Sequence, residues 1–303
     1  MIKELQEKIL ALKAEKNAAI LAHSYIAEEI QEIADVVGDS FALSKKAKDL
    51  PQTTLIMCGV KFMAETCKIL SPEKTVILAN PSAGCPMAEQ FEPSDIEYFK
   101  VHHPQAVTVC YINTTAELKT VCDVCVTSSS AVEICDKLTE NEIIFIPDCN
   151  LGAWVAKKLP HKKIFTLQGG CPIHAAVSKQ DAETARELYP HALMLVHPEC
   201  QPEICAMSDF VGSTSGIIEF ARKSSGTEFI IGTEIAIAEH LQYVCPEKTF
   251  HILSKKLICP NMKVTTLTDV YNALSGGGGL TLDMEPDLIE KAGKCIDKML
   301  ELG

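Results

Sequence analysis

The stretch GGCPIH at residues 169–174 places a cysteine between two glycines and a proline, three residues before a histidine. A closely related stretch, AGCPMA, lies at residues 83–88, and a looser version, LICPNM, lies at 257–262. Their cysteines recur 86 and then 88 residues apart, at Cys85, Cys171 and Cys259. Even spacing of one motif indicates an internal repeat, so other features should follow the same period.

Three apolar runs that end in polar residues do follow this period: AAILAHSY at 18–25, VTVCYIN at 107–113 and LMLVHPE at 193–199. Their matched polar positions are His23, Tyr111 and His197, followed two residues later by Tyr25, Asn113 and Glu199. Further along each copy come an aspartate and then a hydroxyl residue, at Asp35, Asp123 and Asp209 and at Ser40, Ser128 and Thr214. The chain therefore contains three copies of one structural unit.

Each copy reads as strand, helix, helix, strand, helix, strand and cysteine. Short apolar strands that alternate with helices predict small parallel sheets covered by helices on both faces. The predicted fold is α/β, with three homologous three-layer αβα units around a pseudo-threefold axis. The expected boundaries are 1–103 including an N-terminal helix, 104–188, 189–268, and a C-terminal helical tail at 269–303.

Two local features complete the expected fold. The hydroxyl residues Ser40, Ser128 and Thr214 each precede a helical stretch, where serine and threonine are typical N-caps. The tail contains the run SGGGG at 275–279, which is typical of a flexible connector and is compatible with a hinge.

Composition excludes several classes of protein. The net charge is −12 and no basic run occurs, so nucleic-acid binding is not expected. No window holds the 18 or so consecutive apolar residues of a membrane helix. The first residues mix charges with apolar residues at helical spacing, which predicts an amphipathic helix and not a secretory signal. With fourteen cysteines and no such signal, we expect reduced thiols and a cytoplasmic location.

The repeated polar positions all follow strands, at the sheet end where parallel sheets bind ligands. If the three units pack around an axis, Cys85, Cys171 and Cys259 meet there and form a metal centre with one open position. Zinc with a water ligand is one candidate, and a [4Fe–4S] cluster with one free iron is the other. The close pair Cys122–Cys125 lies in a helical stretch and is expected to pack in the core.

Eight separated motifs, among them AHSYIAEEIQEIADVVGDSFALS, CGVKFMAET, NPSAGCPMAE and ICPNMKVTTL, together resemble the quinolinate synthase A family from about residue 15 onward. The resemblance implies three similar α/β units with an oxygen-sensitive [4Fe–4S] cluster. It also implies an enzyme of NAD biosynthesis that condenses iminoaspartate with dihydroxyacetone phosphate, giving quinolinate, phosphate and water. An aspartate oxidase or dehydrogenase that supplies iminoaspartate is the implied partner.

The resemblance assigns roles to residues of this sequence. The cluster ligands are Cys85, Cys171 and Cys259, and an open iron acts as the Lewis acid for dehydration. The implied catalytic residues are His23, Tyr25, Tyr111, His197 and Glu199, with Glu199 as the expected general base. The implied substrate-binding residues are Ser40, Asn113, Ser128, His174, Ser213 and Thr214.

Some residues depart from the family pattern, and other classes remain open. Ile26 and Glu28 stand where many members carry Gln and Pro, so the start of the first helix is expected to differ. One alternative is a three-cysteine radical enzyme of the diphthamide type, which needs S-adenosylmethionine. Another is a structural zinc or electron-transfer protein, which has no use for the clustered hydroxyl residues.

Overall fold

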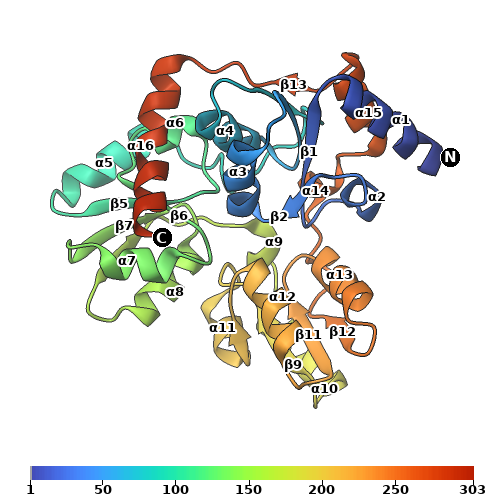
Figure 1. The fold of residues 1–303 in the computed structure, drawn as a ribbon. Helices are drawn as coiled ribbons and strands as arrows, with labels where there is room; N and C mark the ends of the chain where they lie inside the picture. Colours follow the sequence, from blue (N-terminus) through green and yellow to red (C-terminus); the bar gives the residue numbers. More distant parts are fainter. Residues whose placement is uncertain (1) are drawn as a thin grey trace. The chain divides into compact units, whose positions relative to one another are not determined.

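The computed structural model describes residues 2–303, whose helices and strands are labelled in Figure 1. The chain divides into two compact units. Unit 1 comprises Met1–Pro93, Ile112–Val121 and Pro260–Asp297. Unit 2 comprises Ser94–Tyr111, Cys122–Cys259 and Lys298–Gly303. No helix of residues 2–303 has both the length and the apolar character that crossing a membrane requires.

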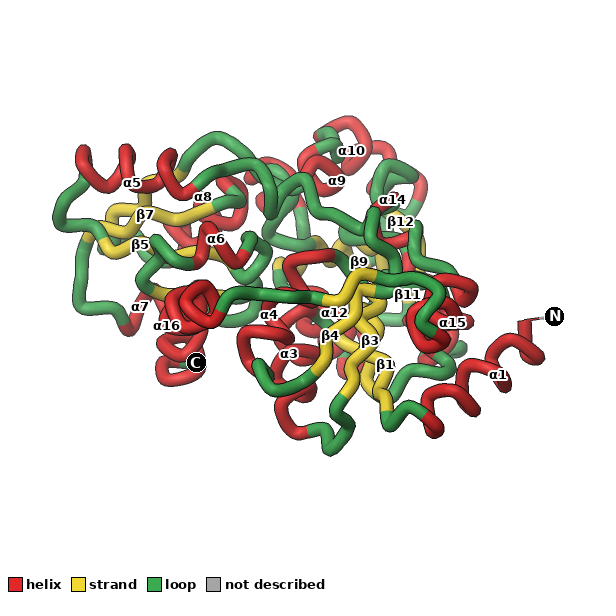
Figure 2. Tube along the Cα trace, turned by 90° about the horizontal axis from the view of Figure 1, so that it is seen from above, coloured by secondary structure: helices red, strands yellow, loops and turns green. Residues whose placement is uncertain are grey.

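Unit 1 is built on one five-stranded sheet with the strand order β13-β4-β3-β1-β2. Its first part contains α1 (Ile2–Glu15), β1 (Ala18–His23), α2 (Glu28–Gln31), β2 (Val36–Gly38), α3 (Ser40–Asp49), β3 (Thr54–Cys58), α4 (Lys61–Leu70) and β4 (Thr75–Leu78). Later segments add α6 (Ala116–Lys119), α14 (Pro260–Lys263), α15 (Leu267–Ser275), β13 (Leu280–Thr281) and most of α16 (Pro286–Leu302). Strands β1 to β4 are parallel and β13 is antiparallel to β4. Figure 2 shows α3 and α4 on one side of this sheet and α1 and α15 on the other.

Unit 2 holds two four-stranded sheets in which every pairing is parallel. The sheet ordered β6-β5-β7-β8 comes with α5 (Pro93–His102), β5 (Val107–Tyr111), β6 (Val124–Val126), α7 (Ala131–Lys137), β7 (Glu142–Ile146), α8 (Cys149–Lys158), β8 (Lys163–Thr166) and α9 (Pro172–Ala175). The sheet ordered β10-β9-β11-β12 comes with α10 (Lys179–Leu188), β9 (Leu193–Val196), α11 (Pro202–Met207), β10 (Phe210–Val211), α12 (Thr214–Lys223), β11 (Glu228–Gly232), α13 (Ala236–Val244) and β12 (Thr249–Ile252).

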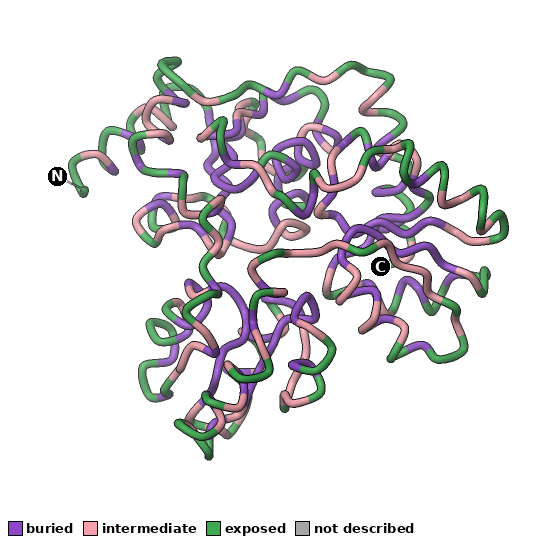
Figure 3. Tube along the Cα trace, turned by 180° about the vertical axis from the view of Figure 1, so that it is seen from behind, coloured by how far each residue is buried: buried purple, intermediate pink, exposed green. Residues whose placement is uncertain are grey.

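The three small parallel sheets confirm the predicted α/β fold of repeated αβα units. The central strands are buried on both faces, as their apolar sequences require, and they form the purple interior in Figure 3. In the last copy, α10 and α11 pack on the face that carries Met194, Val196 and Ile230. Successive side chains of a strand point to opposite faces of the sheet, so Leu195 and Ile231 lie on the other face. Both are buried, which shows that this face is covered as well.

A short strand between the first two helices of each copy was not expected. The stretches expected to be helical contain only α2, α6 and α11, and the chain then forms β2, β6 and β10. The repeated aspartate explains why a strand forms here. Its backbone and its side chain both form hydrogen bonds with the same residue of the first strand. Asp35 Oδ2 accepts from the Ile20 amide at 2.8 Å while its own amide donates to the Ile20 carbonyl at 2.9 Å.

The same exchange recurs in the other two copies. Asp123 pairs in this way with Thr108, and Asp209 pairs with Met194. The period of 88 and 86 residues at this aspartate therefore has a structural cause, since each aspartate holds the start of the short strand beside the first strand.

A second repeated device was missed by the sequence analysis. Three lysines spaced 88 and 86 residues apart turn inward and donate to carbonyl groups at the ends of helices: Lys74 to Ala47 and Leu50, Lys162 to Leu138 and Glu140, and Lys248 to Ala221, Arg222 and Ser224. The helices are α3, α7 and α12, whose final carbonyls have no partner within the helix. A cation also suits the negative end of a helix dipole.

The expected helix caps are shifted by one or two residues. The N-caps of α3 and α12 are Asp39 and Ser213, whose side chains accept from Ala42 and Gly216, so Ser40 and Thr214 are the first helical residues. The N-cap of α7 is Ser130 and not Ser128. In α3 and α12 the helix begins where the N-cap side chain reaches the third amide, whereas Ser130 makes no such hydrogen bond in α7.

The glycine run in the tail has a defined backbone conformation. Gly276 is the left-handed C-cap of α15, with φ of 80°. Gly279 also has a positive φ of 81°, and a Cβ there would lie 2.7 Å from Ile77 Cγ2. The next residues pair with β4, so this connector is anchored to the unit 1 sheet.

Replacing Lys248 with methionine should destabilise the protein by about 2 kcal/mol, because buried carbonyl oxygens lose their donor. Lys223→Met is the matched control, since Lys223 is an exposed partner of Glu219 and should contribute about 0.5 kcal/mol or less. Denaturant unfolding of both variants checks this expectation, and equal stabilities would contradict it.

Candidate functional site

A group of buried polar residues in unit 2 lies at the carboxyl ends of its strands. Tyr111 ends β5, Asp148 follows β7, His197 and Glu199 follow β9, and Thr233 follows β11. Four of these five side chains are less than 5% exposed and Tyr111 is 5% exposed. The carboxyl ends of parallel strands thus deliver these polar groups to one buried site.

Glu199 is the centre of this site. Its Oε2 lies 2.8 Å from Nδ1 of His174 and its Oε1 lies 3.9 Å from Nδ1 of His197. The hydroxyl of Tyr111 also forms a hydrogen bond with the Glu199 carboxylate. The Glu199 backbone carbonyl accepts from Asn150 Nδ2 at 3.0 Å, which fixes the loop after β9.

His174 connects Glu199 with the Cys171 loop. It lies on the short helix α9, three residues after Cys171, and its Nδ1 is 3.2 Å from Cys171 Sγ. Its Nε2 lies 3.1 Å from Thr233 Oγ1 at the end of β11. Partners on both ring nitrogens hold the imidazole in one orientation between the carboxylate and the thiol.

The two-residue spacing in His23–Tyr25 and His197–Glu199 has a common physical explanation. The amide of Tyr25 donates to Nδ1 of His23 at 3.1 Å, and the amide of Glu199 donates to Nδ1 of His197 at 3.3 Å. With Nδ1 acting as an acceptor, the neutral ring carries its proton on Nε2. Both histidines are therefore prepared to donate from Nε2.

The surroundings of the two carboxyl groups in the site shift their pKa values in opposite directions. Burial works to raise the pKa of Glu199, but the positive charges that His197 and His174 carry when protonated, together with the hydrogen bonds from His174 and Tyr111, outweigh it and lower the pKa to about 2. Burial and the nearby Glu199 charge raise the pKa of Asp148 to about 7. Glu199 is therefore the ionised group, as a base requires, and Asp148 is the group that takes up a proton first.

Unit 1 holds the other predicted residues of the first copy. His23 and Tyr25 lie together at the end of β1, with ring centroids 4.5 Å apart in an edge-on contact. Lys263 Nζ donates to the Tyr25 carbonyl at 2.8 Å, which links the loop after β1 to α14. Ser40 begins α3, and Cys85 follows β4.

Asn113 also belongs to unit 1 and has an unusual environment. The buried Lys119 donates to the carbonyls on both sides of it, at 2.9 Å to Ile112 and 2.5 Å to Thr114. Within the described residues, the buried Oδ1 of Asn113 has no hydrogen-bond partner. A buried acceptor without a partner is costly, and a bound ligand is one way to satisfy it.

The predicted cysteine ligands differ from most other cysteines in exposure. Ten of the fourteen are buried, whereas Cys85, Cys149, Cys171 and Cys259 are half-buried, and none of the fourteen forms a disulfide within residues 2–303. Burial raises the pKa of thiols such as Cys58 and Cys67 to about 12, so those thiols stay protonated. A half-buried thiol has a smaller desolvation cost than a buried one when it loses its proton.

Each of the three cysteine loops is tied to its sheet by an equivalent backbone hydrogen bond. The backbone carbonyl two positions before each cysteine accepts a hydrogen bond. The donor is a backbone amide near the start of the helix that follows the third strand of that copy. The bonds are Lys61 to Ala83 at 2.8 Å, Cys149 to Gly169 at 2.9 Å and Ile235 to Leu257 at 2.8 Å. Cys85, Cys171 and Cys259 are thus structurally equivalent.

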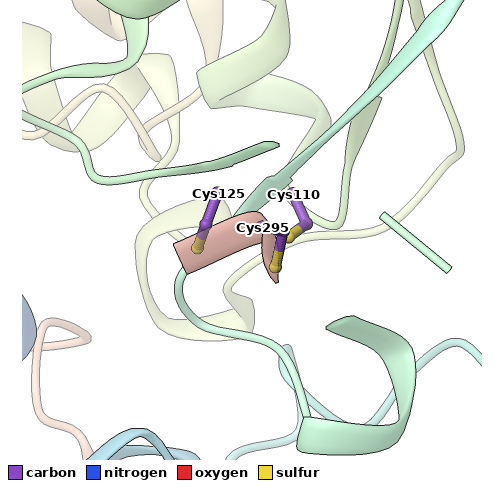
Figure 4. A group of neighbouring side chains, drawn as sticks. All are labelled: Cys110, Cys125 and Cys295. Atoms are coloured by element: carbon purple, nitrogen blue, oxygen red, sulfur yellow. The ribbon is translucent and has the colours of Figure 1, made fainter. Parts of the chain in front are cut away.

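Two groups of ligand atoms within the described residues lie close enough together to hold a metal ion. One is Cys171, His174 and Glu199. The other is a triad of buried thiols, Cys110, Cys125 and Cys295, whose sulfur atoms lie within 4.8 Å of one another (Figure 4). Cys110 and Cys125 are paired residues of β5 and β6, and Cys295 comes from α16.

The sequence analysis missed this triad because Cys125 was considered only with its near neighbour Cys122. Register between β5 and β6 brings Cys125 to Cys110, and no local spacing indicates Cys295. The triad can hold a metal or cluster, although the Cys295 thiol already donates to the Ala292 carbonyl at 3.3 Å and all three side chains are buried.

A buried carboxylate between two histidines, next to the half-buried Cys171 after a parallel strand, is the arrangement of an α/β enzyme with acid–base chemistry and a metal or cluster site. Residues 7–301 match the family model described as Quinolinate synthetase A protein. The chain belongs to the quinolinate synthase A family.

Similar curated proteins cover the whole chain. A quinolinate synthase of Caldicellulosiruptor bescii is 47% identical over 302 residues, covering 100% of this chain and 99% of the relative. One of Thermodesulfovibrio yellowstonii is 44% identical over 302 residues with the same coverage. One of Clostridium kluyveri is 48% identical over 270 residues, or 89% of each chain.

The electrostatic link between the two carboxyl groups is testable in metal-free protein. Glu199→Gln should lower the pKa of Asp148 from about 7, because it removes the negative charge that helps to raise it. Infrared difference spectra follow the carbonyl band of protonated Asp148 during a pH titration, with Asp148→Asn identifying the band. An unchanged midpoint would show that the two groups are not coupled.

Proposed function

We propose that this chain condenses iminoaspartate with dihydroxyacetone phosphate to form quinolinate, phosphate and water, as a step of NAD biosynthesis. The observation that carries the proposal is Glu199, a buried and ionised carboxylate held by His174 one helical turn from Cys171. Full-length similarity to quinolinate synthases supports the same reaction.

The proposed cofactor is a [4Fe–4S] cluster bound by Cys85, Cys171 and Cys259. Their half-buried thiols and their equivalent positions in three repeated loops fit such a donor set. Three ligands leave one iron open, and when bound the cluster supplies a Lewis acid for the dehydration. The proposal requires the three loops to converge on one cluster.

Glu199 is the proposed general base. A general base must be ionised at neutral pH, and the low pKa of Glu199 ensures this, although a pKa nearer the operating pH would make proton transfer more efficient. Tyr111 contacts the Glu199 carboxylate and can pass a proton to or from it. Tyr25 has in the first copy the position that Glu199 has in the third, and it is proposed to move protons or orient the intermediate.

His23 and His197 are proposed to stabilise negative charge. Since the backbone amide two residues on occupies Nδ1 in both rings, Nε2 is the nitrogen that can donate to a carboxylate or a developing oxyanion. His174 has a different role, because both of its ring nitrogens already contact protein groups that hold it against Glu199.

Anionic groups of the substrates are proposed to bind at Asn113, Ser40, Ser128, Ser213 and Thr214. Ser40 and Thr214 begin α3 and α12, where backbone amides and the helix dipole attract anions. This local attraction explains how a chain of net charge −12 can bind two anionic substrates. The free acceptor Oδ1 of Asn113 suits a donor on the substrate, such as the nitrogen of iminoaspartate.

The reaction also implies a source of iminoaspartate, which hydrolyses readily in water. An aspartate oxidase or dehydrogenase in the cytoplasm is the proposed supplier.

Cysteine variants test the ligand assignment. Cys85→Ser, Cys171→Ser and Cys259→Ser should each lose the iron and sulfide of the anaerobically reconstituted protein and its quinolinate formation. Cys110→Ser and Cys125→Ser are controls that should keep both, because they alter the buried triad. The opposite pattern would assign the cluster to the triad, and zinc in place of iron and sulfide would refute the cofactor.

Glu199→Gln should lower kcat by about 100-fold or more while the cluster content stays unchanged, because the amide cannot accept the substrate proton. Glu203→Gln, at an exposed position on α11, is the matched control. Full turnover by Glu199→Gln would remove the proposed base.

A further inference from the structure

Each proposed ligand cysteine has its backbone amide held by a carboxylate. The Cys171 amide donates to Asp148 Oδ2 at 2.8 Å, and the Cys85 amide donates to Glu89 Oε1 at 3.0 Å. In the third copy, the Cys259 amide donates to Glu234 Oε1 at 3.4 Å. The same contact therefore occurs in all three copies, although the acid comes from different places.

In the second and third copies, the carboxylate joins two segments of backbone. The other oxygen of Asp148 accepts from the Leu151 amide at 2.7 Å, and the other oxygen of Glu234 accepts from the Ala236 amide at 2.9 Å. Each carboxylate thus links its cysteine to the start of the helix that follows the third strand, α8 or α13. An amide side chain offers only one acceptor oxygen and cannot make both bonds.

The first copy reaches the same contact by a different route. The position equivalent to Asp148 and Glu234 is Val60, which has no acceptor. Glu89, four residues after Cys85, supplies the carboxylate, and its own amide donates to the Cys85 carbonyl at 3.1 Å.

The residue before each cysteine is fitted to the carboxylate. A Cβ on Gly170 would lie 2.7 Å from Asp148 Oδ2, and one on Gly84 would lie 3.0 Å from Glu89 Oε1. The third copy has Ile258 at this position, and there the amide-to-carboxylate distance is longer, at 3.4 Å. Glycine therefore allows the closer approach in the first two copies.

Burying a carboxylate costs free energy of folding unless hydrogen bonds compensate for the lost hydration. The side chains of Asp148 and Glu234 are 0% exposed, and a buried charge must be compensated by hydrogen bonds. Here the compensating donors are the cysteine and helix amides themselves. This arrangement fixes the loop backbone that sets the direction of each thiol.

We propose that Asp148, Glu234 and Glu89 are positioning residues that hold the backbone of the three cluster cysteines. The inference rests on the proposed function, because it takes Cys85, Cys171 and Cys259 as the ligands. Asp148 has a further effect, since α9 starts at the residue after Cys171 and carries His174 to Glu199. Asp148 thus positions a ligand and the proposed base through one loop.

The test measures how firmly the cluster is held. Reconstituted wild-type protein, Asp148→Asn and Glu234→Gln are exposed anaerobically to an iron chelator, and the loss of cluster absorbance is followed with time. Loss of outer contacts to metal ligands typically costs about 10- to 100-fold in metal affinity. We therefore expect both variants to lose the cluster about 10-fold faster than wild type or more.

Asp181→Asn is the matched control. Asp181 lies in the same unit and accepts from the Ser178 amide at 2.7 Å, but its other partners are the Ser178 hydroxyl and Lys256. It should lose the cluster at the wild-type rate. A change in Asp181→Asn equal to that in Asp148→Asn would mean that loss of any capping carboxylate has the same effect, which overturns the proposal.

Gly170→Ala provides a second test that leaves the acid in place. The added Cβ should push Asp148 Oδ2 away from the Cys171 amide and should accelerate cluster loss. Gly293→Ala is its control, because the nearest atom to a Cβ there lies 3.6 Å away. Thermal unfolding of the metal-free variants shows whether they keep the fold, and Gly170→Ala decides the question if Asp148→Asn does not fold.

The outcomes separate this inference from the proposed function. If wild-type protein takes up no cluster, the proposed function fails and this inference fails with it. If wild type holds a cluster that Cys171→Ser lacks, while Asp148→Asn, Glu234→Gln and Gly170→Ala lose it at the wild-type rate, only the positioning role is overturned.

Discussion

One backbone hydrogen bond in each copy ties the cysteine loop to the end of its sheet, and the site depends on it. The carbonyl two residues before the cysteine accepts from an amide near the start of the helix that follows the third strand of the same copy, at 2.8 to 2.9 Å in all three copies. The sheet fixes the ends of its strands, so this bond places the thiol near the polar residues that follow the other strands. In unit 2 it brings Cys171 and then His174 to Glu199.

Much of this architecture could be predicted from the sequence, because the repeat multiplies weak signals. A single Cys-Pro, or one histidine after an apolar run, is compatible with ordinary packing, but the common period of 86 to 88 residues predicted three sheets and their carboxyl-end sites. The strands β1, β5 and β9 begin where the apolar runs predicted them. The resemblance to the family then indicated Glu199 and its neighbours as site residues, and their proposed roles follow from their chemistry.

Other features could not be predicted for physical reasons. The inward lysines repeat with the same period, but a lysine in a sequence is normally read as a surface residue, and only packing shows Lys74 and Lys248 to be buried. The short strands β2, β6 and β10 depend on the aspartate exchange, which is a contact between segments 15 residues apart. The carboxylates that hold the cysteines escaped notice because the residue type changes between copies, from Asp148 to Glu234 to Val60.

The different origins of these carboxylates bear on how the three copies can diverge or be recombined. In the first copy the acid travels with the loop, four residues beyond its thiol, so a transplanted loop carries its own anchor. In the other two copies the acid remains on the scaffold, so a loop moved without its sheet arrives unsupported. The first loop therefore carries one of its two anchors with it and still needs the Lys61 amide, whereas the second and third loops depend on the scaffold for both.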